Sequence, residues 1–350
     1  MIVVLGIALT LIALLLVTGF AYQWIGGLLD RKRLLAPGRL VDIGEGRRLY
    51  LLEKGSGGPS VIFESGFGAT SLNWTDVQDA VAEHVHTISY DRCGLGWSSP
   101  PASERTPTRI AAELHTLLRA AGVQPPWVLV GHSFGGLVMQ RFALEYPAGT
   151  AGLVLLDPMR TNEWPPLNPA RRGTMERANR LTGYGVHLAR FGVTRLAARS
   201  HLCRSARFSG FLIRLAGAQG EYLSERLNTE IGKMPAQVRP SIAAHWSAPR
   251  FYRGLIAHLR AVPAAVQEMH EAEPIQNVPV VVVTPGSASP IADMEKFGSL
   301  SRQVVARDSR HWVHLDEPEL VVRTILEMAA LARSRNLGSE AGSAVLQGVD

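Results

Sequence analysis

A serine, a histidine and two aspartates stand in this 350-residue sequence at positions where they could carry out nucleophilic acyl transfer. Ser133 lies in the segment Gly131 to Gly135, after the apolar run of residues 127–130 and before a helix-compatible segment that starts at Leu137. A Gly-x-Ser-x-Gly sequence between a strand and a helix forms a sharp turn that exposes the serine hydroxyl. The alternative interpretation is a connection of small residues without chemistry. The context favours a nucleophile at Ser133.

A nucleophilic serine needs a base within hydrogen-bond reach and an acid that orients the base. His311 is the best candidate base, because it follows the last expected strand and a short turn. The alternative is a histidine on a surface loop. His314, three residues on, is expected to pack or to line the site, and a metal pair with His311 would lack a third ligand.

The candidate acid is Asp157, which directly follows the apolar run of residues 151–156. A carboxylate at the C-terminal edge of a strand would point into the same crevice as Ser133. The alternative is a strand-end aspartate that makes local hydrogen bonds. Asp293, seven residues after Gly286, is the second candidate. We favour Asp157.

Eight short apolar or alternating runs predict strands that would form one α/β domain. They cover residues 40–43, 48–53, 60–64, 86–90, 127–130, 151–156, 279–284 and 303–306. Helical patterns cover residues 74–83, 107–121, 137–145 and 318–332. The domain is therefore expected in two parts, residues 38–158 and 274–334.

The strand pattern disappears between these two parts. Residues 159–273 mix Gly, Arg, Trp and Pro with short helical patterns at 222–231 and 251–260, which predicts an inserted helical cap. Its apolar content predicts a pocket above Ser133. The last segment, residues 335–350, is rich in Gly and Ser and is expected to be a flexible tail.

The N-terminal segment predicts a membrane anchor, residues 1–29, followed by a linker, residues 30–37. The segment from Ile2 to Leu29 contains no charged residue, and as a helix it is long enough to cross a hydrocarbon core of about 30 Å. Tyr22, Trp24 and the basic cluster at residues 31–33 follow where an interface would lie. A signal peptide would begin with basic residues, which are absent here.

The charge distribution indicates on which side of the membrane the catalytic domain lies and which partners it binds. The basic cluster after the anchor favours a cytoplasmic catalytic domain, although an outward-facing domain remains the alternative. The net charge of +6 comes from arginine that is densest between Arg160 and Arg214, without interleaved aromatics. This indicates a basic surface near anionic lipid and no nucleic-acid partner. Cys93 and Cys203 lie far apart in the sequence and belong to no metal-binding motif, so neither a disulfide framework nor a metal site is expected.

Five sequence blocks, in order, resemble those of the α/β-hydrolase fold family, and the resemblance extends from about Gly38 to Arg333. The blocks are Ser65-Gly66-Phe67-Gly68, Tyr90 to Ser98, Gly131 to Gly136, Leu155-Leu156-Asp157 and His311 to Leu315. The resemblance implies a mostly parallel eight-stranded sheet with helices on both faces. It also implies an oxyanion hole made by the backbone N–H groups of Phe67 and Phe134.

Two positions depart from the family's pattern. The family most often carries its acid after the strand at 279–284, but Gly286 to Pro290 contains no carboxylate; some members place it where this chain has Asp157. The family's catalytic histidine usually follows glycine, and here Arg310 stands in its place.

These observations together predict a membrane-anchored serine hydrolase that cleaves carboxylic esters or related acyl compounds through an acyl-enzyme. It would require no cofactor or metal, and its partners would be a small acyl substrate and the lipid bilayer. A nucleophilic serine argues against dehalogenase or epoxide hydrolase chemistry, for which this fold uses aspartate. The alternative is a non-catalytic ligand-binding or scaffold member of the same fold.

Overall fold

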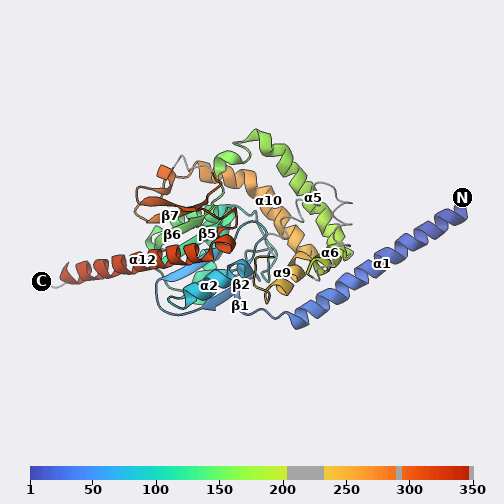
Figure 1. Ribbon diagram of the computed structural model, residues 1–350, viewed down its shortest axis with the longest axis horizontal. Coiled ribbons are helices and arrows are strands. Elements are labelled where there is room, and N and C mark those ends of the chain that lie inside the picture. Colours follow the sequence, from blue (N-terminus) through green and yellow to red (C-terminus); the bar gives the residue numbers. More distant parts are fainter. Residues whose placement is uncertain (203–231, 289–293, 347–350) are drawn as a thin grey trace.

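The computed structural model describes residues 1–202, 232–288 and 294–346, and an eight-stranded sheet lies at its centre (Figure 1). The strand order is β1-β2-β4-β3-β5-β6-β7-β8. The pairs β1–β2 and β2–β4 are antiparallel and the remaining pairs are parallel. The strands are β1 (Arg39–Asp42), β2 (Arg48–Lys54), β3 (Ser60–Glu64), β4 (Thr87–Tyr90), β5 (Trp127–His132), β6 (Thr150–Leu156), β7 (Val280–Pro285) and β8 (Ser301–Ala306).

Helices cover both faces of this sheet and form a separate layer above one of its ends. They are α1 (Ile2–Arg33), α2 (Thr75–Ala82), α3 (Pro107–Ala121), α4 (Phe134–Glu145), α5 (Arg172–Arg190), α6 (Val193–Leu202), α9 (Arg239–Trp246), α10 (Pro249–His270), α11 (Val313–Asp316) and α12 (Pro318–Leu346). Short 3₁₀ helices are η1 (Ser71–Trp74), η2 (Pro147–Gly149), η3 (Thr161–Glu163), η4 (Pro169–Arg171) and η5 (Met294–Phe297).

The two faces of the sheet bury separate apolar cores. On one face, strand side chains such as Leu129 pack with Leu117 of α3 and Phe142 of α4. On the other face, Val130 packs with residues of α2 and α12, including Ile325. Strands buried on both faces read as continuous apolar runs, as β3 and β5 do. The mostly parallel eight-stranded sheet with helices on both faces, expected from the sequence, is confirmed.

The register of the parallel strands brings their C-terminal ends to one edge. Val130 of β5 lies opposite Phe63 of β3 and Val154 of β6, and Val154 lies opposite Val281 of β7. The residues that follow β3, β5 and β6 therefore meet at this edge. Ligands of open parallel sheets bind there.

The segment expected as a cap contains α5, α6, α9 and α10 in its described part. The helical pattern at 251–260 belongs to α10, and the pattern at 222–231 lies outside the described residues. Val262 and Val266 of α10 pack with Phe134 and Val138 of α4. The cap layer therefore rests on the helix that begins immediately after Ser133.

Helices extend into both terminal segments that were expected to be irregular. Helix α12 continues to Leu346, and the flexibility of the tail, residues 335–350, stays a prediction. The expected linker, residues 30–37, is likewise helical to Arg33. The helix expected from residue 74 begins as the 3₁₀ turn η1 before α2.

The apolar helix α1 is long enough to cross a membrane, but its last third contacts the protein. Its residues up to Gly19 are exposed or nearly so, whereas Gln23 and Gly26 are buried against the cap. The side chain of Arg195 in α6 donates to Gln23 Oε1 (2.9 Å) and forms an ion pair with Asp30. Residues 19–30, expected as part of the anchor and its linker, therefore form a docked extension of α1 (Figure 1).

Candidate active site

Ser133 lies on a strained turn between β5 and α4. Its backbone has φ 54° and ψ −120°, a region that side chains rarely adopt and that accompanies functional strain. The N–H of Ser133 donates to the carbonyl of Leu156 (3.0 Å), and its own carbonyl accepts from Met159 (3.1 Å). These bonds fix the turn to the end of β6.

The glycines of the turn are required by close contacts. A Cβ on Gly131 would lie 2.6 Å from the carbonyl oxygen of Gly135, and one on Gly135 would lie 2.5 Å from the carbonyl oxygen of Glu64. Neither distance is tolerated by a real Cβ. The Gly-x-Ser-x-Gly spacing therefore follows from the sharpness of the turn.

Asp157 and His311 meet at the same edge of the sheet. Asp157 follows β6 with φ 39°, and its N–H donates to the carbonyl of Val283 in β7 (2.8 Å). Its Oδ2 atom lies 2.8 Å from Nδ1 of His311. Because an ionised carboxylate can only accept, Nδ1 carries the proton and Nε2 of the neutral ring is left as the basic nitrogen.

The loop that carries His311 is held by two neighbours. The Nε2–H group of His132 donates to the carbonyl oxygen of His311 (2.7 Å). The carboxylate of Asp316 accepts from the backbone N–H of Arg310 (2.9 Å). Arg310 thus occupies the position of the family's glycine, and its backbone is held by this hydrogen bond.

Ser133 and His311 do not share a hydrogen bond among the described residues. The ring of His132, next to Ser133 in the chain, lies 4.7 Å from the ring of His311 between centroids. In unliganded enzymes such nucleophile–base bonds are often long and tighten when substrate binds.

The loop after β3 lies against the serine turn. A Cβ on Gly66 would lie 3.3 Å from Cβ of Ser133, so glycine allows the backbone to approach. The ring of Phe67 stacks on that of Phe134 with centroids 4.3 Å apart. Phe134 is the first residue of α4, so its N–H has no acceptor inside the helix. Phe67 and Phe134, the expected oxyanion donors, are thus brought together.

Arg92, from the turn after β4, holds the loop that contains Phe67. Its buried guanidinium donates to the carbonyl oxygens of Ser65 (2.7 Å) and Gly66 (2.5 Å) and to the carboxylate of Glu64 (3.0 Å). It also lies 5.3 Å from the ring centroid of Phe134. Burial raises the pKa of the Glu64 carboxyl, and the Arg92 charge opposes this rise.

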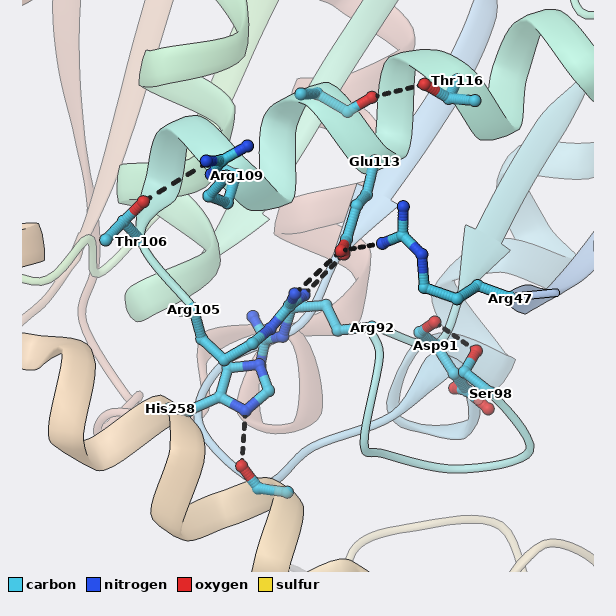
Figure 2. A network of polar contacts seen from close by, with 12 residues as sticks. Arg47, Asp91, Arg92, Ser98, Arg105, Thr106, Arg109, Glu113, Thr116 and His258 are labelled. Carbon is cyan, nitrogen blue, oxygen red and sulfur yellow. Dashed lines mark hydrogen bonds and ion pairs between the residues drawn. The ribbon is translucent and has the colours of Figure 1, made fainter. Parts of the chain in front are cut away.

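A second buried arginine stands beside Arg92 (Figure 2). Arg105 is fully buried and forms two hydrogen bonds with Glu113 (3.0 and 2.7 Å), which also binds Arg47. His258 of α10 lies by this pair, and burial lowers its pKa well below the usual range, with both arginines adding to the effect. His258 is therefore neutral, and its Nδ1–H group donates to the carbonyl of Gly254 (2.8 Å).

His314 packs under the site rather than on it. Its ring is buried and stacks on Trp74 with centroids 4.5 Å apart. Burial, with a smaller contribution from His311, lowers the pKa of His314 to about 3. A neutral histidine in an apolar contact is the packing role that the sequence suggested.

One cavity of about 190 Å³ lies between α4, α10 and the segment after Asp157. Its walls include Leu137, Met159 and Met269, but not Ser133 or His311. The apolar pocket expected above Ser133 therefore stays a prediction.

Sequence reasoning assigned no role to Arg92 or His132. Arg92 had a signal, since it stands in a matched block, but its partners depend on β3 and β4 being neighbours. His132 occupies the variable position before Ser133, where nothing in the sequence indicates a bond to a loop 179 residues away. The second candidate acid, Asp293, lies outside the described residues.

Comparisons with known proteins agree with this architecture. A family described as alpha/beta hydrolase fold matches residues 59–318. An uncharacterized protein of Bacillus subtilis (strain 168), YqjL, is 36% identical over 105 residues, which cover 30% of this chain and 42% of that protein. The chain spans less than half the length of the curated relatives it matches.

Two solved structures resemble nearly the whole chain. The epoxide hydrolase CorEH has a TM-score of 0.61 at 18% identity and covers 84% of this chain and 98% of its own. A thermophilic esterase from Thermogutta terrifontis has a TM-score of 0.57 at 20% identity and covers 85% of this chain and 99% of its own. At these identities the likeness extends to the fold alone.

Proposed function

Because the chain belongs to the α/β-hydrolase fold family, we propose that it is a serine hydrolase that cleaves carboxylic esters or related acyl compounds. Ser133 is the nucleophile, His311 the base and Asp157 the acid that orients the base. The backbone N–H groups of Phe67 and Phe134 bind the oxyanion.

In this mechanism Ser133 Oγ attacks the acyl carbon while Nε2 of His311 takes its proton. Asp157 fixes the tautomer through the Nδ1–H bond and stabilises the imidazolium that forms. Negative charge on the tetrahedral intermediate is met by the two N–H groups, and collapse releases the alcohol with the proton held by His311. Water then attacks the acyl-enzyme with His311 again as base, which returns free Ser133.

The observation that carries the proposal is the combination of a strained Ser133 with the His311–Asp157 pair at one sheet edge. A glycine would adopt φ 54° at position 133 at lower conformational cost than a serine. A serine retained there is best explained by its hydroxyl.

The competing proposal is a ligand-binding member of the same fold that makes no acyl-enzyme. The lack of a hydrogen bond between Ser133 and His311 among the described residues and the presence of Arg310 favour it. A fluorophosphonate probe separates the two, because it reacts only with an activated serine. We expect labelling of the wild-type protein, none of Ser133→Ala, and strong reduction in His311→Gln. Absent labelling of a folded wild-type protein would support the binding protein instead.

Hydrolysis of p-nitrophenyl esters of increasing chain length then defines the acyl group. We also propose that α1 anchors the protein in a membrane with the catalytic domain on the cytoplasmic side, which the basic residues 31–33 favour. Protease protection of the catalytic domain in sealed membrane vesicles tests this orientation.

A further inference from the structure

The docked end of α1 lies beside cap helices that carry exposed apolar residues. A Cβ on Gly19 would lie 2.5 Å from the carbonyl oxygen of Phe191, at the junction of α5 and α6. Tyr22 contacts Gly192 at the same junction and lies 5.9 Å from the Arg199 guanidinium. Contact between α1 and the cap therefore begins at Gly19, and through Arg195 it continues to Asp30.

The opposite side of α1 stays apolar and exposed along this docked stretch. Trp24, Ile25 and Leu29 are all exposed, although they follow the contact at Gly19. About 20 residues cross the hydrocarbon core, so a span from Ile2 ends near residue 21 and the next residues lie among the headgroups. The cap helices that flank residues 19–29 must then lie in the headgroup layer as well.

Helix α5 runs crosswise to α1 in Figure 1, as a helix lying on the bilayer would. Leu181, Tyr184 and Leu188 of α5 are spaced three and four residues apart and share one exposed face. Tyr184 is 59% and Leu188 47% exposed. Val193 and Leu196 of α6 are exposed too, beside the junction that contacts α1.

The charge of these helices complements an anionic surface. Residues 171–199 contain seven arginines and one glutamate, a net charge of +6 that equals the formal net charge of the whole chain. Basic helices with an apolar face lie in the plane of anionic membranes, and each basic residue near the surface adds to the attraction.

We infer that helices α5 and α6 form a membrane-docking surface, with the apolar face of α5 inserted between anionic phospholipid headgroups. The docking rests on α1 being a membrane anchor, and the delivery of substrate described next rests on the proposed hydrolase function as well. The cap would then hold the catalytic edge at a fixed height over the bilayer, so that acyl substrates dissolved in the lipid are the ones delivered to it.

The test uses the full chain, with Cys203→Ser to remove a competing thiol, reconstituted into phosphatidylcholine vesicles with and without phosphatidylglycerol. An environment-sensitive fluorophore is attached at Tyr184→Cys or, separately, at Leu188→Cys. Spin-labelled phosphatidylcholine serves as the quencher. The control is Glu83→Cys, an exposed position between the end of α2 and the start of β4, at the end of the sheet opposite to the C-terminal strand ends where Ser133 and Asp157 lie.

We expect several-fold stronger quenching at positions 184 and 188 than at 83, with an increase when phosphatidylglycerol is present. Equal quenching at all three positions in protein that resists carbonate extraction would overturn the docking surface and leave the anchor intact. Release of the protein by carbonate would overturn the anchor and, with it, this inference. Fluorophosphonate labelling of the same samples reports the hydrolase function independently of either result.

Discussion

The carboxylate of Asp157 lies 2.8 Å from the Nδ1 atom of His311, across 154 residues of sequence. The two side chains come from the end of β6 and from the loop after β8, and β7 separates these strands. The His311 side chain is 48% exposed, so solvent reaches the pair from one side. The hydrogen bond to Asp157 orients the His311 ring, and the carboxylate also fixes the tautomer with the proton on Nδ1.

Replacing Asp157 by asparagine should nearly abolish hydrolysis. The amide keeps the size of the side chain but neither fixes the tautomer of His311 nor stabilises the imidazolium, and in the type case of this triad the same change lowers kcat about 10⁴-fold. Ester hydrolysis and the rate of fluorophosphonate labelling measure the effect.

Asp293→Asn is the matched control for this variant. If Asp157 is the acid, Asp293→Asn should change stability by only about 0.5 kcal/mol or less and leave kcat near the wild-type value. An inactive Asp293→Asn beside a nearly normal Asp157→Asn would reverse the assignment.

Arg92→Lys should lower kcat more than it raises KM. Lysine keeps the charge but cannot reproduce the planar fork that holds the carbonyls of Ser65 and Gly66. The Phe67 N–H would then be displaced from the oxyanion, and loss of one such donor costs about 10²–10³-fold in kcat, which sets the upper limit. Steady-state kinetics with a short p-nitrophenyl ester separate the effect on kcat from the effect on KM.

Arg105→Lys separates positioning from simple destabilisation. Arg105 is as deeply buried as Arg92, but its bonds go to Glu113 and not to the loop that contains Ser65 and Gly66. We expect both variants to unfold more easily and only Arg92→Lys to lose kcat. Equal kcat values in the two variants would contradict a positioning role for Arg92.

The parts predictable from the sequence are those with a local cause. The strands are continuous apolar runs, and the turn at Ser133 needs glycines on both sides, so both could be predicted from neighbouring residues. The edge where Asp157 and His311 meet follows from parallel strands that end together. Their catalytic roles remain predictions.

The parts that escaped prediction depend on distant partners. Arg195 is 3% exposed because Gln23 and Asp30 lie against it, and the pairing spans more than 160 residues. In sequence, Gln23 interrupts an apolar helix without explanation and Arg195 is one of many arginines. Only the contact of α1 with the cap shows why both are there.

Acid should destabilise the protein through its buried histidines. Burial lowers the pKa of His314 and of His245 to about 3 and that of His258 well below its usual range, while in the unfolded chain the value is about 6.5. Between these values the unfolded state binds protons that the native state does not. Stability is therefore complete above about pH 6.5 and falls as the pH drops below it, by about 1.4 kcal/mol per pH unit for each histidine.

His314→Phe should flatten this dependence and keep the stacked contact with Trp74. Neither ring nitrogen of His314 has a hydrogen-bond partner among the described residues, so the substitution leaves no group there unsatisfied. Denaturant midpoints of the detergent-solubilised protein at about pH 7 and pH 5 measure the slope. His84→Phe, at an exposed position, is the control; an unchanged slope in His314→Phe would show that acid acts elsewhere.

A chain that starts at Leu35 should keep a folded hydrolase core but loosen its cap. The sheet begins at Arg39, so its strands and both apolar cores remain. Arg195, however, loses both Gln23 and Asp30, and the cap face that α1 covers becomes exposed to water. We expect a soluble protein that fluorophosphonate still labels, with α5 and α6 cut by protease sooner than in the full chain.

Asp30→Asn in the full chain removes the ion pair alone, which should cost about 2 kcal/mol of stability because Arg195 is buried and Asp30 partly exposed. It should therefore accelerate cleavage of the same helices while the protein stays in the membrane. Equal cleavage rates in the full chain, the shortened chain and Asp30→Asn would show that α1 does not support the cap.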